Sequence, residues 1–197
     1  DAQESRGLGD VYKRQIMVSS NPATHYARLS IALHWLMLVL LAAVYALIEL
    51  RGLFPKDSVE RNLMKDLHFM LGLSVFVLVW LRLAMRLSRP TPPIVPKPPA
   101  WQTGLAHLMH LALYLMMIGL PLAGWLILSA ADKPVPFFGL ELPHLIGPNP
   151  DEAKFIKGWH ERIGSWGYWL IGLHALAGLY HHYVQRDNTL LRMLPYK

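Results

Sequence analysis

The chain contains no cysteine. This absence excludes disulfide bonds, iron–sulfur clusters, thiolate zinc sites and covalently attached c-type haem. Any metal chemistry therefore depends on the ten histidines, the carboxylates and the methionines.

Charged residues are scarce: they make up 16% of the chain, against 53% for apolar residues. An ordinary soluble domain carries about 25% charged residues. The apolar residues gather in four stretches, each close to the roughly twenty residues that span a bilayer core. The predicted spans are residues 29–50, 67–88, 104–130 and 160–184. The sequence therefore predicts an all-α fold, an integral membrane four-helix bundle formed by residues 27–197 as one domain.

The net charge of +6 would fit nucleic-acid binding, but the basic residues cluster at the ends of the apolar stretches. Membrane orientation explains this placement better, so we expect a lipid bilayer and no nucleic acid as partner. Arg82, Arg86, Arg89 and Lys97 follow the second span with no acidic residue among them, and Arg28 precedes the first. This asymmetry favours a multi-pass protein with both termini in the cytoplasm.

The remaining segments are polar or rich in proline. Residues 1–26 are predicted to form a polar tail. Residues 1–16 lack the apolar core of a signal peptide, and Met17 is a candidate natural start. The fold prediction therefore leaves residues 1–16 out. Six prolines within residues 90–99 predict a semi-rigid spacer. Pro121 predicts a kink in the third span. Residues 56–66 and 131–157 are predicted connectors.

Two histidines of the fourth span, His160 and His174, lie fourteen residues apart. At 100° and 1.5 Å per residue they share a helix face and stand about 21 Å apart along the axis. An imidazole inside a membrane is costly without a partner, so such histidines are functional candidates. In the predicted topology His68 matches the depth of His160 near the outer surface, and His34 matches His174 in the inner half. The alternative for any one of them is a helix–helix hydrogen bond.

Two histidine pairs at different depths suit two haems, because bis-imidazole ligation gives an electron-transfer iron with no open position. A zinc or di-iron site in a bundle would need carboxylates, which the interiors of the spans almost lack. A porphyrin also needs small residues where it lies against a helix. Gly72, Gly164, Gly172 and Gly178 flank the candidate ligands, although small residues equally serve helix packing.

Other polar residues have two interpretations each. Arg82 lies fourteen residues after His68 and could bind a haem propionate or anchor the helix at the headgroups. His181 lies on the His174 face and could relay protons to a quinone or lie at the interface. His107 and His110 could contact quinone or propionate or be interfacial. The outer basic residues form a solvated rim or steer an anionic substrate; the candidates for steering are Arg61, Lys65, Lys154, Lys157 and Arg162.

Several motifs resemble those of the bacterial cytochrome b561 family, from about Arg28 to the C-terminus. They are Leu33-His34-Trp35, Arg51-Gly52-Leu53-Phe54-Pro55, Pro90-Thr91-Pro92-Pro93, Gly104-Leu105-Ala106-His107, Trp159-His160-Glu161, Gly172-Leu173-His174-Ala175 and His181-His182-Tyr183 with Asp187-Asn188-Thr189-Leu190-Leu191-Arg192. The resemblance implies a four-helix cytochrome of the bacterial inner membrane with two b haems held by the four histidines.

The resemblance also implies an activity, since the best-understood relatives are superoxide oxidases that pass electrons from periplasmic superoxide to ubiquinone. On this basis we expect a superoxide:quinone oxidoreductase, with the quinone near the inner haem. The alternative is a conduit without its own substrate, fed by a partner dehydrogenase or hydrogenase. A transporter that uses its histidines as proton relays is a third class, and it predicts no haem absorption.

Overall fold

The computed structural model describes residues 25–195. Residues 1–24 of the predicted polar tail lie outside this range. Four long helices dominate the described chain: α2 (Arg28–Leu50), α3 (Val59–Ser88), α4 (Ala100–Ala130) and α5 (Pro150–Tyr180). Short elements join or follow them: the 3-10 turn η1 (Arg51–Leu53), the π-turn η2 (His181–Gln185), the 3-10 turn η3 (Leu191–Met193) and two strands. The predicted all-α bundle is confirmed.

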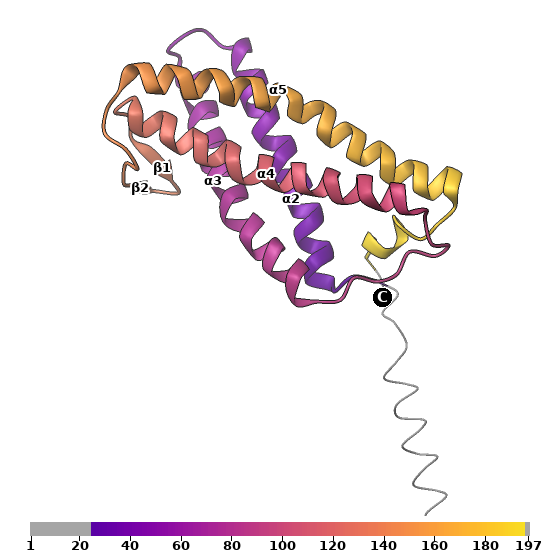
Figure 1. Cartoon of the computed structure of the whole chain (residues 1–197). Coiled ribbons are helices and arrows are strands. Elements are labelled where there is room, and N and C mark those ends of the chain that lie inside the picture. Colours follow the sequence, from indigo (N-terminus) through magenta and orange to yellow (C-terminus); the bar gives the residue numbers. More distant parts are fainter. Residues whose placement is uncertain (1–24, 196–197) are drawn as a thin grey trace, which may run out of the picture.

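The helices pack in chain order as two pairs (Figure 1): α2 lies along α3 and α4 lies along α5, with α3 against α4 between the pairs. The backbones of α2 and α5 stay apart along almost their whole length. We call the end that holds the start of α2 and the end of α5 the inner end, and the opposite end the outer end. Whatever joins α2 to α5 must therefore be a side chain or a bound group.

The helices extend well beyond the apolar stretches. α3 begins at Val59, so the prediction of a connector over residues 56–66 was wrong for most of that segment; the Ser58 hydroxyl caps the helix by accepting from the Arg61 amide at 3.2 Å. α5 begins at Pro150 rather than near Trp159, because Asn149 accepts from the amides of Asp151 and Glu152. Hydrophobicity marks only the membrane core, whereas capping residues set the helix ends.

Three of the described helices, α2 with η1, α3 and α4, are long and apolar enough to cross a membrane. α5 has 31 residues but lies outside this group, because His174 and several glycines interrupt its most apolar stretch. At 1.5 Å per residue it extends about 46 Å, more than the roughly 30 Å of a bilayer core. α4 continues through Pro121 as one helix, and residues 90–99 form no helix or strand.

The predicted connector over residues 131–157 contains a hairpin that the sequence analysis did not predict. Strands β1 (Val135–Phe137) and β2 (Leu140–Leu142) pair antiparallel around Phe138 and Gly139, both with positive φ. Val135 is fully buried beneath the hairpin in a cluster with Leu73 and Leu128. The hairpin therefore covers the outer ends of α3 and α4.

A second apolar cluster lies at mid-membrane depth. Its buried members come from three helices: Met37, Val75, Val79, Leu113, Met116 and Met117. Val75 lies seven residues after His68 and seven before Arg82, so this cluster separates the levels of the two predicted histidine pairs.

Candidate functional site

The structure brings the four candidate histidines together as two pairs. At the inner end His34 of α2 faces His174 of α5, with ring centres 6.2 Å apart and ring planes at 73°. Toward the outer end His68 of α3 faces His160 of α5, with ring centres 6.3 Å apart and planes at 70°. The partners in each pair are those that depth matching predicts.

The spacing within each pair suits two imidazoles on opposite sides of one metal ion. An imidazole nitrogen lies about 2 Å from a bound transition metal and about 1 Å from its own ring centre, so opposed ligands place their ring centres about 6 Å apart. Both observed distances, 6.2 and 6.3 Å, match this value. Among residues 25–195, no group of three or more His, Asp or Glu side chains could hold a metal ion. The pairs therefore fit a metal whose other ligands come with it, as in haem.

The surroundings of the outer pair also fit a bound group. The Nδ1–H of His68 donates to the Val44 carbonyl at 2.9 Å, which leaves Nε2 for a metal. The ring of His160 is largely buried and lies near the Leu120 carbonyl of α4. A carbonyl beside Nδ1 would leave Nε2 of His160 for a metal, as in His68. Gly124 of α4 faces this ring, since a Cβ there would lie 3.6 Å from Cε1 of His160.

The four flanking glycines lie beside open space. A Cβ built on Gly72, Gly164, Gly172 or Gly178 meets no atom of the described structure within 4 Å. No neighbouring helix fills these positions, so helix packing does not explain them. Gly72, Gly164 and Gly178 follow His68, His160 and His174 by four residues on the same helix faces, so the space beside them could admit a planar cofactor. Gly172, in contrast, lies on the opposite, exposed face of α5.

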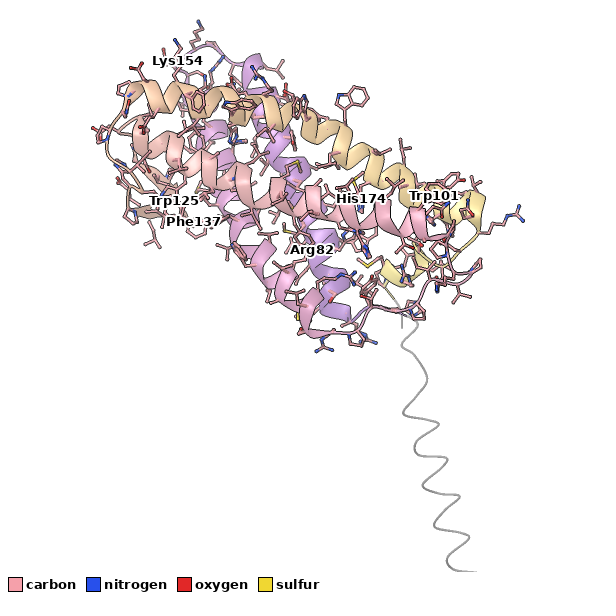
Figure 2. The ribbon with its side chains drawn as sticks, viewed as in Figure 1. Arg82, Trp101, Trp125, Phe137, Lys154 and His174 are labelled. Carbon is pink, nitrogen blue, oxygen red and sulfur yellow. The ribbon has the colours of Figure 1, made fainter. Side chains whose placement is uncertain are left out.

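Arg82 and His110 lie close to the inner pair. The charge of Arg82 acts on both His34 and His174, and Figure 2 shows Arg82 and His174 in the same region of the bundle. The ring of His110 lies 5.5 Å from that of His174, centre to centre. Both α4 histidines are exposed, and it is the ring of His110 that contacts the pair.

The outer basic residues lie around the far end of the bundle, where Figure 2 labels Lys154. Arg51 is close enough for its charge to act on His68. Arg61 donates to the Phe54 carbonyl at 3.0 Å and Lys65 to the Asn62 side chain at 3.1 Å. Both keep their positive charge, because neither partner is acidic.

Two other members of that rim are less available. Lys157 pairs with Glu161 at 3.4 Å, which offsets its charge. The guanidinium of Arg162 lies over the Trp159 ring, 4.8 Å from its centre. The rim is therefore uneven, with its free positive charge on the α3 side.

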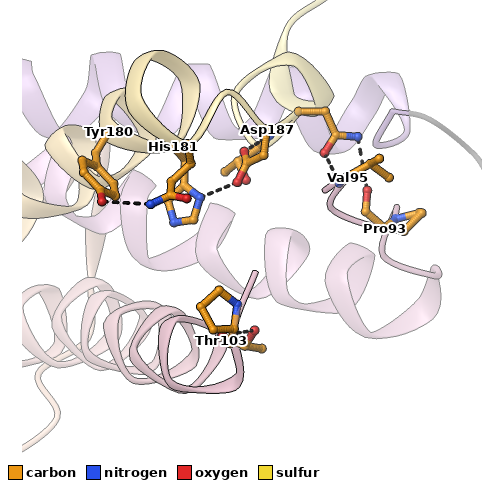
Figure 3. Close-up of polar contacts among 10 residues, drawn as sticks. Pro93, Val95, Thr103, Tyr180, His181 and Asp187 are labelled. Atoms are coloured by element: carbon orange, nitrogen blue, oxygen red, sulfur yellow. Dashed lines mark hydrogen bonds and ion pairs between the residues drawn. The ribbon is translucent and has the colours of Figure 1, made fainter. Parts of the chain in front are cut away.

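His181 has a partner that the sequence analysis missed (Figure 3). Its Nδ1 lies 2.5 Å from Oδ2 of Asp187, a carboxylate that is only 5% exposed. The approach requires the π-turn η2 and the left-handed Arg186 (φ 54°), which turn the chain back on itself. Burial alone would raise the pKa of Asp187, but hydrogen bonds from His181 and Thr189 outweigh it and hold the pKa below its ordinary value.

The segment after η2 closes the inner end. Asn188 exchanges hydrogen bonds with Val95, donating to its carbonyl at 3.1 Å and accepting from its amide at 2.9 Å. Buried Arg192 donates to the Pro92 carbonyl, and Trp35 donates to that of Met193 at 2.8 Å. The tail thus connects the end of α5, the proline-rich connector and the start of α2. The sequence contained a signal for these contacts, because Asp187, Asn188 and Arg192 are the polar residues of one of the motifs that carry the family resemblance.

A helical membrane bundle with opposed histidine pairs defines the class of a membrane cytochrome. The family model described as prokaryotic cytochrome b561 matches residues 25–196. The chain is 45% identical over 172 residues to "Probable superoxide oxidase CybB" of Yersinia pestis, covering 87% of this chain and 97% of that protein. It is 43% identical over 170 residues to "Cytochrome b561 homolog 1" of Escherichia coli K12, covering 86% and 97%.

A more distant relative, "Cytochrome b561 homolog 2" of Escherichia coli K12, is 28% identical over 181 residues, covering 90% of this chain and 95% of the relative. The chain belongs to the prokaryotic cytochrome b561 family. Membership implies an electron-transport membrane protein that binds b-type haem, as the sequence resemblance predicted.

Proposed function

We propose that the protein is a superoxide oxidase with two b haems, which transfers electrons from superoxide at the outer end to ubiquinone at the inner end. The observation that carries the proposal is the pair of opposed histidines at each of two depths, with a group of basic residues around the outer end. A relative 45% identical to the chain has the name of a probable superoxide oxidase. The balanced reaction takes two superoxide anions, one quinone and two protons to two dioxygen molecules and one quinol.

In this proposal His68 and His160 would hold the outer haem, and His34 and His174 would hold the inner haem. A haem with two imidazole ligands supplies a carrier that takes up and passes on one electron at a time without binding oxygen. The protein's own contribution is to hold these ligands at fixed spacing. Arg82 is the proposed partner of an inner propionate, because a guanidinium matches a carboxylate and the residue lies beside the inner pair.

At the outer end the basic side chains steer the anionic donor. Arg51 and Arg61 lie near the start of α3, and Lys65 lies one turn before His68. A concentration of positive charge raises the encounter rate of a small anion by about ten- to a thousandfold. Because Lys157 is paired with Glu161, the proposal assigns most of the steering to the α3 side, with Lys154 and Arg162 contributing from α5.

At the inner end the acceptor needs a binding site and protons. An open hollow of about 370 Å³ lies at the start of α2, lined by Arg28, Ile31, Ala32, Pro195 and Trp35, the residue that follows His34. Its size and apolar lining suit a quinone ring. His181 is the proposed proton donor: with Nδ1 held by Asp187, Nε2 remains free to exchange a proton with a reduced quinone. These positions require the termini to face the cytoplasm of the bacterial inner membrane.

A pulse of superoxide given to the purified protein with ubiquinone tests the function. Rapid haem reduction followed by quinol formation, without any partner protein, is the expected result. A haem pair that stays oxidised after the pulse would instead favour the conduit, fed by a dehydrogenase or hydrogenase docked on the outer loops. A preparation without haem absorption despite ample haem supply would remove both alternatives.

A further inference from the structure

A tyrosine lies between the two histidine levels. On α5, Gly167 follows His160 by seven residues and precedes His174 by seven, so the three share one helix face at intervals of about 10 Å. Within the described α5, full burial is restricted to Ala153 and Gly167. The side chain that buries Gly167 is Tyr45 of α2. The Tyr45 backbone follows Val44, whose carbonyl accepts from His68, and its hydroxyl reaches the midpoint of α5 between the pairs.

The contact depends on the absence of a side chain at position 167. A Cβ there would lie 2.0 Å from the Tyr45 hydroxyl oxygen, 3.2 Å from its ring carbon Cζ and 2.9 Å from Sδ of Met116. The ring of Tyr45 thus lies directly on the backbone of α5. This contrasts with Gly72, Gly164, Gly172 and Gly178, where a Cβ meets nothing within 4 Å. The α5 face is consequently closed at its midpoint and open beside the histidines.

Tyr45 also joins two helices whose backbones do not otherwise meet. Its hydroxyl donates to the Gly164 carbonyl of α5 at 2.8 Å. Its ring lies 4.5 Å, centre to centre, from that of Tyr168, whose hydroxyl donates to Glu49 of α2 at 2.8 Å. Met116 connects the same point to the mid-membrane cluster. Tyr45 and Tyr168 therefore both bridge α5 and α2, and Tyr45 is the one whose side chain lies on the α5 backbone at Gly167.

We propose that Tyr45, seated on Gly167, is a positioning residue that fixes the separation of the two haem sites and closes the apolar layer between them. The inference rests on the proposed pair of haem sites. Because α5 supplies one ligand to each site, a shift of α5 at Gly167 displaces both ligands relative to α2 and α3. The hydroxyl holds the helix in place, while the ring and Met116 exclude water from the layer.

The test compares Tyr45→Phe, Tyr45→Ala and Gly167→Ala with Tyr168→Phe as the matched control. A redox titration of the visible spectrum measures the two midpoint potentials, and haem content is measured alongside. Tyr45→Ala and Gly167→Ala are expected to retain two haems, shift the separation between the potentials and slow electron equilibration between the sites severalfold. Tyr45→Phe keeps the ring and loses only the hydroxyl, so its shift is smaller. Tyr168→Phe matches the wild type.

A purely structural role would lower the melting temperature without moving the potentials. Two retained haems with unchanged potentials and equilibration in both Tyr45→Ala and Gly167→Ala would overturn the proposal. If Tyr45→Ala and Gly167→Ala fail to fold, the midpoint potentials of Tyr45→Phe decide the question. Unchanged potentials in Tyr45→Phe would then overturn the proposed role of the hydroxyl. A wild type with one haem would instead refute the two-site function itself. A wild type with two haems that ignores superoxide can still be titrated with a chemical reductant, so the two failures are distinguishable.

Discussion

The outer and inner histidine pairs have almost the same internal geometry and different surroundings. Ring centres are 6.3 Å apart in the outer pair and 6.2 Å apart in the inner pair, with planes at 70° and 73°. The β-hairpin packs against α3 at Phe69, next to His68, and basic residues lie around the outer end. The inner pair has a third histidine, an arginine and a tail with a buried carboxylate around it. The comparison indicates that helix geometry makes both sites alike, and that their neighbours give each its chemistry.

The largest expected effect removes one site and leaves the other. His34→Ala is expected to lose the inner haem and His160→Ala the outer haem, because an axial ligand has no substitute on the opposite face. A pyridine haemochrome assay should then find one haem per chain in each variant and two in the wild type. The matched control is His110→Ala, whose ring lies 5.5 Å from His174, and it should keep both. Two haems in His34→Ala would invalidate the pairing.

Neutralising the rim should affect the outer end alone. Arg61→Gln combined with Lys65→Gln is expected to reduce the superoxide-driven rate about tenfold at low salt, because the steering charge is lost. The rate should depend less on ionic strength than in the wild type, while the apparent affinity for quinone stays the same. Lys157→Gln serves as control, since Glu161 already offsets that charge. Equal loss in both variants would argue against steering from the α3 side.

Asp187→Asn should affect the inner end alone. It replaces the carboxylate that contacts Nδ1 of His181 with a neutral amide of similar shape, which keeps an oxygen acceptor. Quinol formation is expected to slow about tenfold, as for the loss of an assisted proton transfer, while initial haem reduction by superoxide is unchanged. Stopped-flow spectra that follow haem and quinol separately measure both. If the initial haem reduction by superoxide were slower in this variant, Asp187 would not act through proton transfer to the quinone.

The same carboxylate gives a pH dependence of stability. Because its pKa in the folded protein lies below the ordinary value, Asp187 contributes stability above the ordinary aspartate pKa of about 4. That contribution is lost as the pH falls through the lowered pKa. Asp187→Asn should therefore be less stable than the wild type at neutral pH, and the difference between the two should narrow in acid. Thermal unfolding monitored at several pH values measures this difference.

The smallest expected effect concerns the outer start of α5. Asn149→Ala removes an N-cap that accepts from two amides at 3.2 Å each, so it should cost about 1 kcal/mol of unfolding free energy. Haem content should stay at the wild-type value, because His160 lies three turns further along. Loss of the outer haem in this variant would mean that the capped start of α5 keeps His160 in position. The expected result is that packing further along α5 does so.

Several features of the site were predictable because they follow from helix periodicity. The fourteen-residue spacing of His160 and His174 and the depth of His34 and His68 are properties of the sequence alone, and the structure brings these residues together in the expected pairs. Asp187 was not predictable in this way. It reaches His181 through a π-turn and a left-handed residue, and neither follows a regular repeat.

The β-hairpin and Gly167 illustrate the same limit. The hairpin's strands are three residues long, too short for a clear alternating pattern, and packing of Val135 under α3 and α4 stabilises them. Gly167 lies on the histidine face at equal spacing from both ligands, a signal that was present in the sequence. Only the tertiary structure shows that the Tyr45 side chain of α2 occupies the space beside Gly167, while the space beside Gly164 and Gly172 is open.

The sequence by itself determined that the chain spans a membrane and that four histidines lie at two depths, because apolar length and helical repeat are local properties. The tertiary structure decided which neighbours each pair has: the hairpin and cations outside, the Asp187 tail inside and Tyr45 between. Those contacts join residues far apart in the chain, and their geometry depends on how whole helices pack.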